Sequence, residues 1–253
     1  MKLAVAGKGG VGKTSLTAWI GDYLVRQGRE TWLVDADTAL SLGAALGLSP
    51  ENIPSPLIQD EPLIRERIGT GLLDLNPRVE DLPEKLRVRA GGLNLLVMGS
   101  VAGAGGGCAC GANALLKALL AHLLLDLDQW LVVDLEAGVE HLGRGTVSAV
   151  DGLVVVSEPS WRGLSVAARI AEMAAELELT RQVLVLNRAE NGTPLPNIPG
   201  LPPLVASIPA LPGLARRQLD SPCVLDLPER PDLDKACFAI LSALAGQEPQ
   251  TSR

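Results

Sequence analysis

The sequence predicts an α/β protein built on one doubly wound, mostly parallel sheet flanked by helices. Three observations predict this fold. Short β-branched runs alternate with helix-like segments, several runs are apolar at every position, and the first run passes through a glycine-rich loop into a helix. Runs such as "GLVVVS" and "QVLVLN" suit strands that are covered on both faces, as strands of a parallel sheet are.

The alternation extends over most of the chain. Strands are expected at Lys2–Ala6, Thr31–Asp35, Leu93–Met98, Trp130–Leu135, Gly152–Ser157, Gln182–Asn187 and Leu204–Ile208. Helices are expected at Lys13–Gln27, Ala112–Leu125, Gly163–Leu177, Pro212–Leu219 and Asp232–Leu244. We expect one domain over 1–246, with an irregular region at 44–92 that contains one or two short helices, a proline-rich surface loop at 193–203 and a flexible tail at 247–253.

The composition restricts the class of function. Of the 253 residues 47% are hydrophobic, enough for a full core, but only 2% are aromatic, so the core must be aliphatic. The net charge of −7 argues against broad binding to nucleic acid or acidic membranes. No apolar run reaches bilayer length and the start does not resemble a signal peptide. We therefore expect a cytoplasmic protein without nucleic-acid or membrane partners.

The strongest motif is the loop "GKGGVGKT" at 7–14, which fits G-x-x-x-x-G-K-[ST] between a strand and a helix. In such a loop, backbone N–H groups turn inward around phosphate oxygens and the helix N-terminus adds positive potential. Lys13 would reach the β- and γ-phosphates, and the Thr14 hydroxyl would bind Mg²⁺. The alternative is a glycine turn with a chance lysine. The residues expected to contact ATP or ADP are Gly9, Gly10, Val11, Gly12, Lys13, Thr14 and Ser15.

Two further strands end in aspartates. "WLVDAD" (32–37) ends with Asp35 and Asp37, and "WLVVDLEAG" (130–138) places Asp134 after an apolar run. An aspartate at such a strand end can hold the water shell of Mg²⁺. We expect this role for Asp134, with Asp35 near the same ion. A strand-end aspartate can equally be a helix cap.

A second lysine, Lys8, lies inside the loop. The run "KGGVGKT" resembles the signature of the deviant Walker A ATPases, which include MinD, ParA, the nitrogenase iron protein and several metallocentre maturation factors. The resemblance implies a homodimer in which Lys8 reaches the partner's nucleotide, so charge stabilisation depends on dimerisation. It also implies that Asp37 orients the attacking water and that Asn187 contacts adenine. The alternatives are a solvated loop lysine at position 8 and a strand-end turn residue at position 187.

Cys108 and Cys110 lie in the segment "GGGCACGANALLKALL" (105–120). A metal site, a redox pair and two small core residues are all compatible with the pair alone. Residues i and i+2 of an extended segment point the same way, and two such pairs related by a dimer axis supply the four ligands of a tetrahedral site. Thiolates favour Zn²⁺, Ni²⁺ or Cu(I) over Mg²⁺ or Ca²⁺.

Three segments make the resemblance more specific. "GCACGANALLKALL", "DLEAGVEHLGRGT" and "SEPSWRGLSVAARI" resemble the CooC family, ATPases that assist nickel insertion into carbon monoxide dehydrogenase, with relatives serving acetyl-CoA synthase. The resemblance implies that Cys108 and Cys110 bind one nickel or zinc ion between two protomers, and that a nickel enzyme is the client. Thr38 departs from the family, where proline is expected.

The sequence alone leaves alternative roles open for several residues and for the protein as a whole. His141 is either a switch residue or a plain loop histidine, and Cys223 and Cys237 are expected in the core. A MinD- or ParA-like positioning ATPase is one alternative function. An iron–sulfur reductase resembling the nitrogenase iron protein is another, but no cysteine occurs between Asp134 and Cys223 to complete its ligand set.

Overall fold

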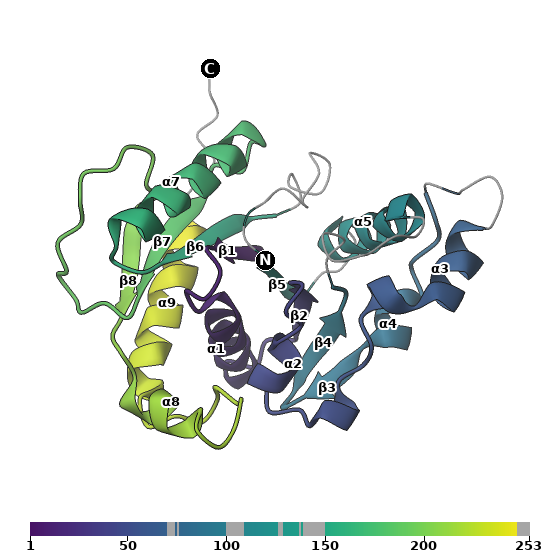
Figure 1. Ribbon diagram of the computed structural model, residues 1–253, viewed down its shortest axis with the longest axis horizontal. Helices are drawn as coiled ribbons and strands as arrows, with labels where there is room; N and C mark the ends of the chain where they lie inside the picture. Colours follow the sequence, from purple (N-terminus) through teal and green to yellow (C-terminus); the bar gives the residue numbers. More distant parts are fainter. Residues whose placement is uncertain are drawn as a thin grey trace.

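The computed structural model describes residues 1–69, 74, 76–99, 109–125, 129–136, 138 and 150–246. Within this part of the chain, eight strands form one sheet in the order β3-β4-β2-β5-β1-β6-β7-β8 (Figure 1). Every neighbouring pair is parallel except β3 and β4. The strands are β1 (Lys2–Gly7), β2 (Thr31–Ala36), β3 (Val88–Ala90), β4 (Leu93–Val97), β5 (Trp130–Leu135), β6 (Gly152–Ser157), β7 (Gln182–Asn187) and β8 (Leu204–Ile208).

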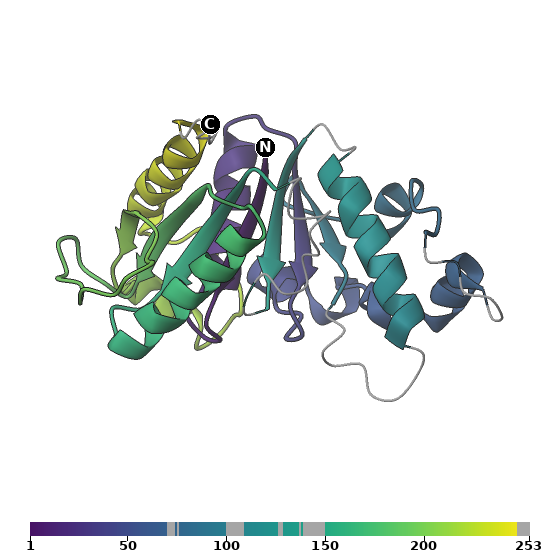
Figure 2. The same cartoon turned by 90° about the horizontal axis from the view of Figure 1, so that it is seen from above.

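Helices cover both faces of the sheet, which confirms the doubly wound fold (Figures 1 and 2). The larger helices are α1 (Lys13–Arg26) and α9 (Arg230–Gly246) on one face, and α5 (Ala109–Leu125) and α7 (Trp161–Glu176) on the other. The short ones are α2 (Leu42–Ala45), α3 (Glu61–Ile68), α4 (Leu82–Leu86), α8 (Pro212–Arg217) and the 3₁₀ turns Pro50–Asn52 and Leu57–Gln59.

The strand order determines where a ligand can bind. β1 lies between β5 and β6, and the chain leaves β1 toward β2 on one side and later returns to β6 on the other. In open α/β sheets such a reversal leaves a crevice at the carboxyl ends of the strands. Asp35 of β2 is the register partner of Asp134 of β5, and Gly7 of β1 is that of Val156 of β6. The predicted site residues therefore converge on one edge.

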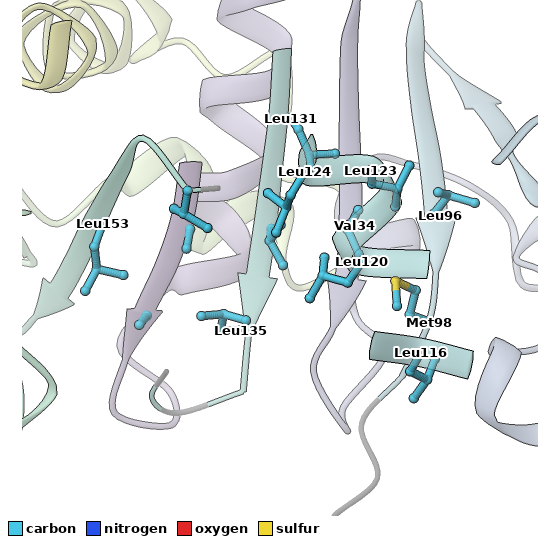
Figure 3. Close-up of a cluster of buried hydrophobic side chains, with 14 of the residues drawn as sticks. Val34, Leu96, Met98, Leu116, Leu120, Leu123, Leu124, Leu131, Leu135 and Leu153 are labelled. Atoms are coloured by element: carbon cyan, nitrogen blue, oxygen red, sulfur yellow. The ribbon is translucent and has the colours of Figure 1, made fainter. Parts of the chain in front are cut away.

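The core beneath α5 is aliphatic, as the composition predicts (Figure 3). Buried leucines of the helix face apolar side chains of β2, β4 and β5. The helix residues are Leu116, Leu120, Leu123 and Leu124, and the strand residues include Val34, Leu96, Leu131 and Leu135. Because this packing fixes the sheet from the side opposite α1, it holds the strand ends of the site in place.

The structure differs from the sequence-based prediction mainly in the region 44–92. Where the sequence predicts one or two short helices, this region holds α3, α4 and two 3₁₀ turns, and it adds β3, which pairs antiparallel with β4. Three residues, "VRA", are too few for a periodic signal. Helix α5 begins at Ala109, three residues earlier than expected. No helix in the described ranges is long and apolar enough to cross a membrane.

Truncation of the α5 core tests this packing. Leu123 is fully buried, so Leu123→Ala should lower the free energy of unfolding by about 2–5 kcal/mol through lost burial and a residual cavity. Lys117 on the same helix is exposed, and Lys117→Ala should change it by less than about 0.5 kcal/mol. Urea denaturation of both variants measures the difference, and equal effects would contradict the assigned helix face.

Candidate functional site

The glycine-rich loop joins β1 to α1, and its backbone conformation requires glycine at several positions. Gly10 and Gly12 have φ of 79° and 99°, in the left-handed region. At Gly7 a Cβ atom would stand 2.3 Å from the carbonyl oxygen of Val156. Gly12 is the N-cap of α1, which has no side-chain cap and no acidic residue in its first turn. The first-turn N–H groups are therefore left for an anion.

Lys13 is the first residue of α1, directly after the glycine-rich loop, and it is buried. Its side chain is 5% exposed, and Nζ lies 3.8 Å from Oδ2 of Asp37. At that distance the contact is a loose ion pair rather than a hydrogen bond. The other carboxylate oxygen of Asp37 accepts a hydrogen bond from the Ala39 amide at 2.8 Å. The structure thus brings Lys13 and Asp37 together, while Lys8 lies half-buried on the loop itself.

Asp35 organises the loop that follows β2. Its carboxylate accepts hydrogen bonds from the amides of Leu42 at 3.0 Å and Asp37 at 3.3 Å. Burial raises the pKa of this carboxyl to about 6, against the lowering effect of those two amides. Leu40 within the loop has φ of 49°, an unusual conformation for leucine. Ser41 donates to the Thr14 hydroxyl at 3.4 Å, so the loop touches the start of α1.

Asp134 differs from Asp35 because no backbone amide donates a hydrogen bond to its carboxylate. It is 0% exposed, and no donor forms a hydrogen bond of ordinary geometry with either carboxylate oxygen, although the Thr14 hydroxyl lies near enough to affect its pKa. Burial raises its pKa to about 7, while the Thr14 hydroxyl and Lys13 act in the lowering direction. A buried carboxylate without a donor is costly. A cation with its water shell would satisfy both oxygens, so the site fits Mg²⁺.

Asn187 ends β7 and contacts the glycine-rich loop across the sheet edge. Its Nδ2 donates to the carbonyl oxygen of Val11 at 2.8 Å, and its Oδ1 accepts from the Arg188 amide at 3.0 Å. The family resemblance implies that Asn187 contacts the nucleotide, but no local pattern predicts its bond to the loop, because 176 positions separate Asn187 from Val11.

The cysteines divide into two groups. Cys110 lies in the first turn of α5, so its backbone is helical rather than extended, contrary to the prediction from the spacing of the two cysteines. Cys108 and His141 lie outside the described residues. Cys237 is buried as expected, and burial raises its pKa to about 12. Cys223 is only half-buried, with Sγ packed toward Gly47. In the described residues, no three His, Cys, Asp or Glu side chains are grouped to hold a metal ion.

A phosphate loop at the reversal point of a doubly wound sheet, with two strand-end aspartates beside it, defines the class of P-loop nucleotide-binding proteins. Residues 2–199 match the CobQ/CobB/MinD/ParA nucleotide binding domain family, CbiA. This match covers more than half of the chain. The protein therefore belongs to the CobQ/CobB/MinD/ParA nucleotide-binding family.

Sequence identity to individual proteins shows which members of this family the chain is similar to. The carbon monoxide dehydrogenase accessory protein CooC of Rhodospirillum rubrum is 41% identical over 195 residues, 74% of each chain. An uncharacterized ATP-binding protein of Methanocaldococcus jannaschii is 36% identical over 197 residues, 76% of each chain. The resemblance to CooC-type ATPases expected from the sequence is confirmed at this level.

Solved structures agree in fold. MinD of Aquifex aeolicus, in its complex with MinC, has a TM-score of 0.68 at 21% identity and covers 99% of this chain and 98% of its own. A ParA family ATPase of Chlorobium tepidum has a TM-score of 0.66 at 19% identity, with 96% and 97% covered. At these identities the likeness supports the fold alone.

The buried aspartates predict an unusual pH dependence of stability. Because the pKa of Asp134 is raised from 3.8 to about 7 on folding, the folded protein binds more protons than the unfolded chain between those values. The free energy of unfolding should therefore fall as pH rises through this window. Without nucleotide and Mg²⁺, Asp134→Asn should be more stable than wild type by roughly 2–4 kcal/mol above about pH 7.

The gain should vanish below about pH 3, where the carboxyl of Asp134 carries its proton in the folded and in the unfolded wild-type chain alike. Urea titrations across that range measure it. A gain of equal size at both ends of the range would show that the charge on Asp134 is not the cause.

Proposed function

We propose that the protein is an ATP-hydrolysing maturation factor that assists nickel insertion into carbon monoxide dehydrogenase or acetyl-CoA synthase. The observation that carries the client assignment is the 41% identity to CooC over 74% of both chains. The nucleotide chemistry is supported separately by the family and by the geometry around the loop. Nickel, or zinc in its place, is the cargo of this protein rather than a resident cofactor.

Hydrolysis is assigned to residues at the sheet edge. Lys13, now 3.8 Å from Asp37, exchanges this carboxylate for the β- and γ-phosphates when nucleotide binds. Asp37 is then free to orient the attacking water, and the amides of the loop stabilise the developing charge. Thr14 and Asp134 would hold Mg²⁺, the latter through water, with Asp35 beside them. When bound, this ion supplies charge neutralisation at the phosphates.

The dimer is the second part of the proposal. Lys8 is half-buried on the loop, within the signature in which a lysine crosses to the partner's nucleotide. In a closed homodimer it adds positive charge to the phosphates of the other subunit. Two chains also bring two copies of Cys108 and Cys110 to one axis, which gives the four thiolates a thiophilic ion prefers. Nucleotide and metal then favour the same closed state.

A MinD-like switch is the second candidate. It is favoured by the Thermotoga maritima MinD, which is 30% identical over 173 residues, although that match covers only 55% of the relative. A protein of this kind would hydrolyse ATP without binding a stoichiometric thiolate-ligated metal ion. The two candidates therefore share the nucleotide chemistry and differ at Cys108 and Cys110.

Kinetics separate the two roles assigned to the ion pair. Asp37→Asn should keep ATP affinity but lower kcat by about 10²–10⁴-fold, because the water loses its orienting carboxylate. Lys13→Ala should lose both affinity and turnover. Lys235→Ala, at an exposed position of α9, serves as the control and should hydrolyse ATP at the wild-type rate. An Asp37→Asn variant with unchanged kcat would remove Asp37 from the mechanism.

The metal and dimer assignments need a separate experiment. Metal analysis with size-exclusion chromatography should find about one nickel or zinc ion per two chains in the closed dimer, since each chain supplies two of four ligands. Cys108→Ser/Cys110→Ser should lose the metal. Cys223→Ser, a half-buried cysteine, is the matched control and should retain it. Absence of stoichiometric metal from wild type and double variant alike would favour the MinD-like switch.

A further inference from the structure

Asn187, which is proposed to contact the adenine base, also forms a hydrogen bond with the backbone of the phosphate loop. Its Nδ2 donates to the Val11 carbonyl at 2.8 Å, inside the loop that is proposed to hold phosphate. We propose that Asn187 is a positioning residue for the phosphate loop, holding the Val11–Gly12 peptide in the orientation that binds phosphate even without a base. The inference rests on the proposed nucleotide function and adds a role at the phosphate end of the site.

Because the Val11–Gly12 peptide is planar, a hydrogen bond to the Val11 carbonyl also restrains the Gly12 N–H. In a trans peptide the C=O and the following N–H point in opposite directions. A Val11 carbonyl directed at Asn187 therefore fixes the Gly12 N–H pointing away from Asn187. With Gly12 at φ 99°, the glycine side of this peptide adds little steric restraint on its orientation, since glycine populates both signs of φ. The side-chain amide supplies the restraint that the glycine lacks.

Packing reinforces the hydrogen bond. A Cβ atom on residue 12 would stand 2.3 Å from Nδ2 of Asn187, so the amide lies directly against the Gly12 backbone. The amide itself is fixed from its other end, where Oδ1 accepts from the Arg188 N–H at 3.0 Å. Arg188 has φ of 55°, and its guanidinium pairs with Glu158 beyond β6. The end of β7 is thus tied to both the loop and the end of β6.

Tripolyphosphate tests the inference because it has phosphates and no base. Calorimetric titration with Mg²⁺ present should show that Asn187→Ala weakens tripolyphosphate binding about tenfold, the cost of a lost hydrogen bond that leaves an acceptor unpaired. Asn187→Leu keeps the number and the branching of the side-chain heavy atoms but removes the donor, and it should weaken binding to a similar extent. Asn191→Ala, at an exposed position of the following loop, is the matched control and should bind as wild type does.

The outcomes are distinct. If Asn187 contacts only the base, Asn187→Ala weakens ATP and leaves tripolyphosphate affinity unchanged, and that result overturns the inference while the proposed function stands. If it only fills space, Asn187→Leu binds as wild type does, which also overturns it. Wild-type protein that binds neither ligand overturns the proposed function and the inference with it. Thermal unfolding of each variant confirms that the chain is folded under the conditions of the titration.

Discussion

The close approach of Asp35 and Asp134 is the constraint on which the rest of the site depends. They are register partners in neighbouring parallel strands, and both are almost fully buried. Burial opposes the ionisation of both carboxylates, and the charge of Asp35 opposes that of Asp134 further. This unfavourable burial of two carboxylates occurs at the carboxyl ends of the strands, next to the phosphate loop that follows β1. Lys13 compensates part of this cost at Asp134, whereas the charge of Asp37 adds to it at both carboxylates.

The two carboxylates are compensated in different ways. Backbone amides of the loop after β2 satisfy Asp35, so this residue fixes the local chain. Asp134 receives no such donor, and a hydrated cation would satisfy its unpaired oxygens. This division separates an organising aspartate from a metal-facing one, although both end apolar strands. It also explains why the free protein should be more stable when Asp134 is neutral.

Local patterns predicted the sheet and the phosphate loop well. The loop motif, the strand-end aspartates and the continuous apolar strands are each properties of a short stretch of sequence. Contacts between distant stretches left no such pattern. The bond from Asn187 to Val11 depends on the strand order, and the amides that satisfy Asp35 depend on the path of one loop. The antiparallel β3 is too short for periodicity, and the helical state of Cys110 reflects a helix that starts before its apolar run.

The central claim is that this sheet edge binds the phosphates and the magnesium ion of ATP. A crystal structure with Mg²⁺ and a non-hydrolysable ATP analogue tests it most directly. The account predicts phosphates within the loop at 9–14, Lys13 displaced from Asp37, and Asp134 hydrogen-bonded to water on the ion. A nucleotide seated elsewhere, for example in the groove of about 350 Å³ between β8 and α9, would contradict it.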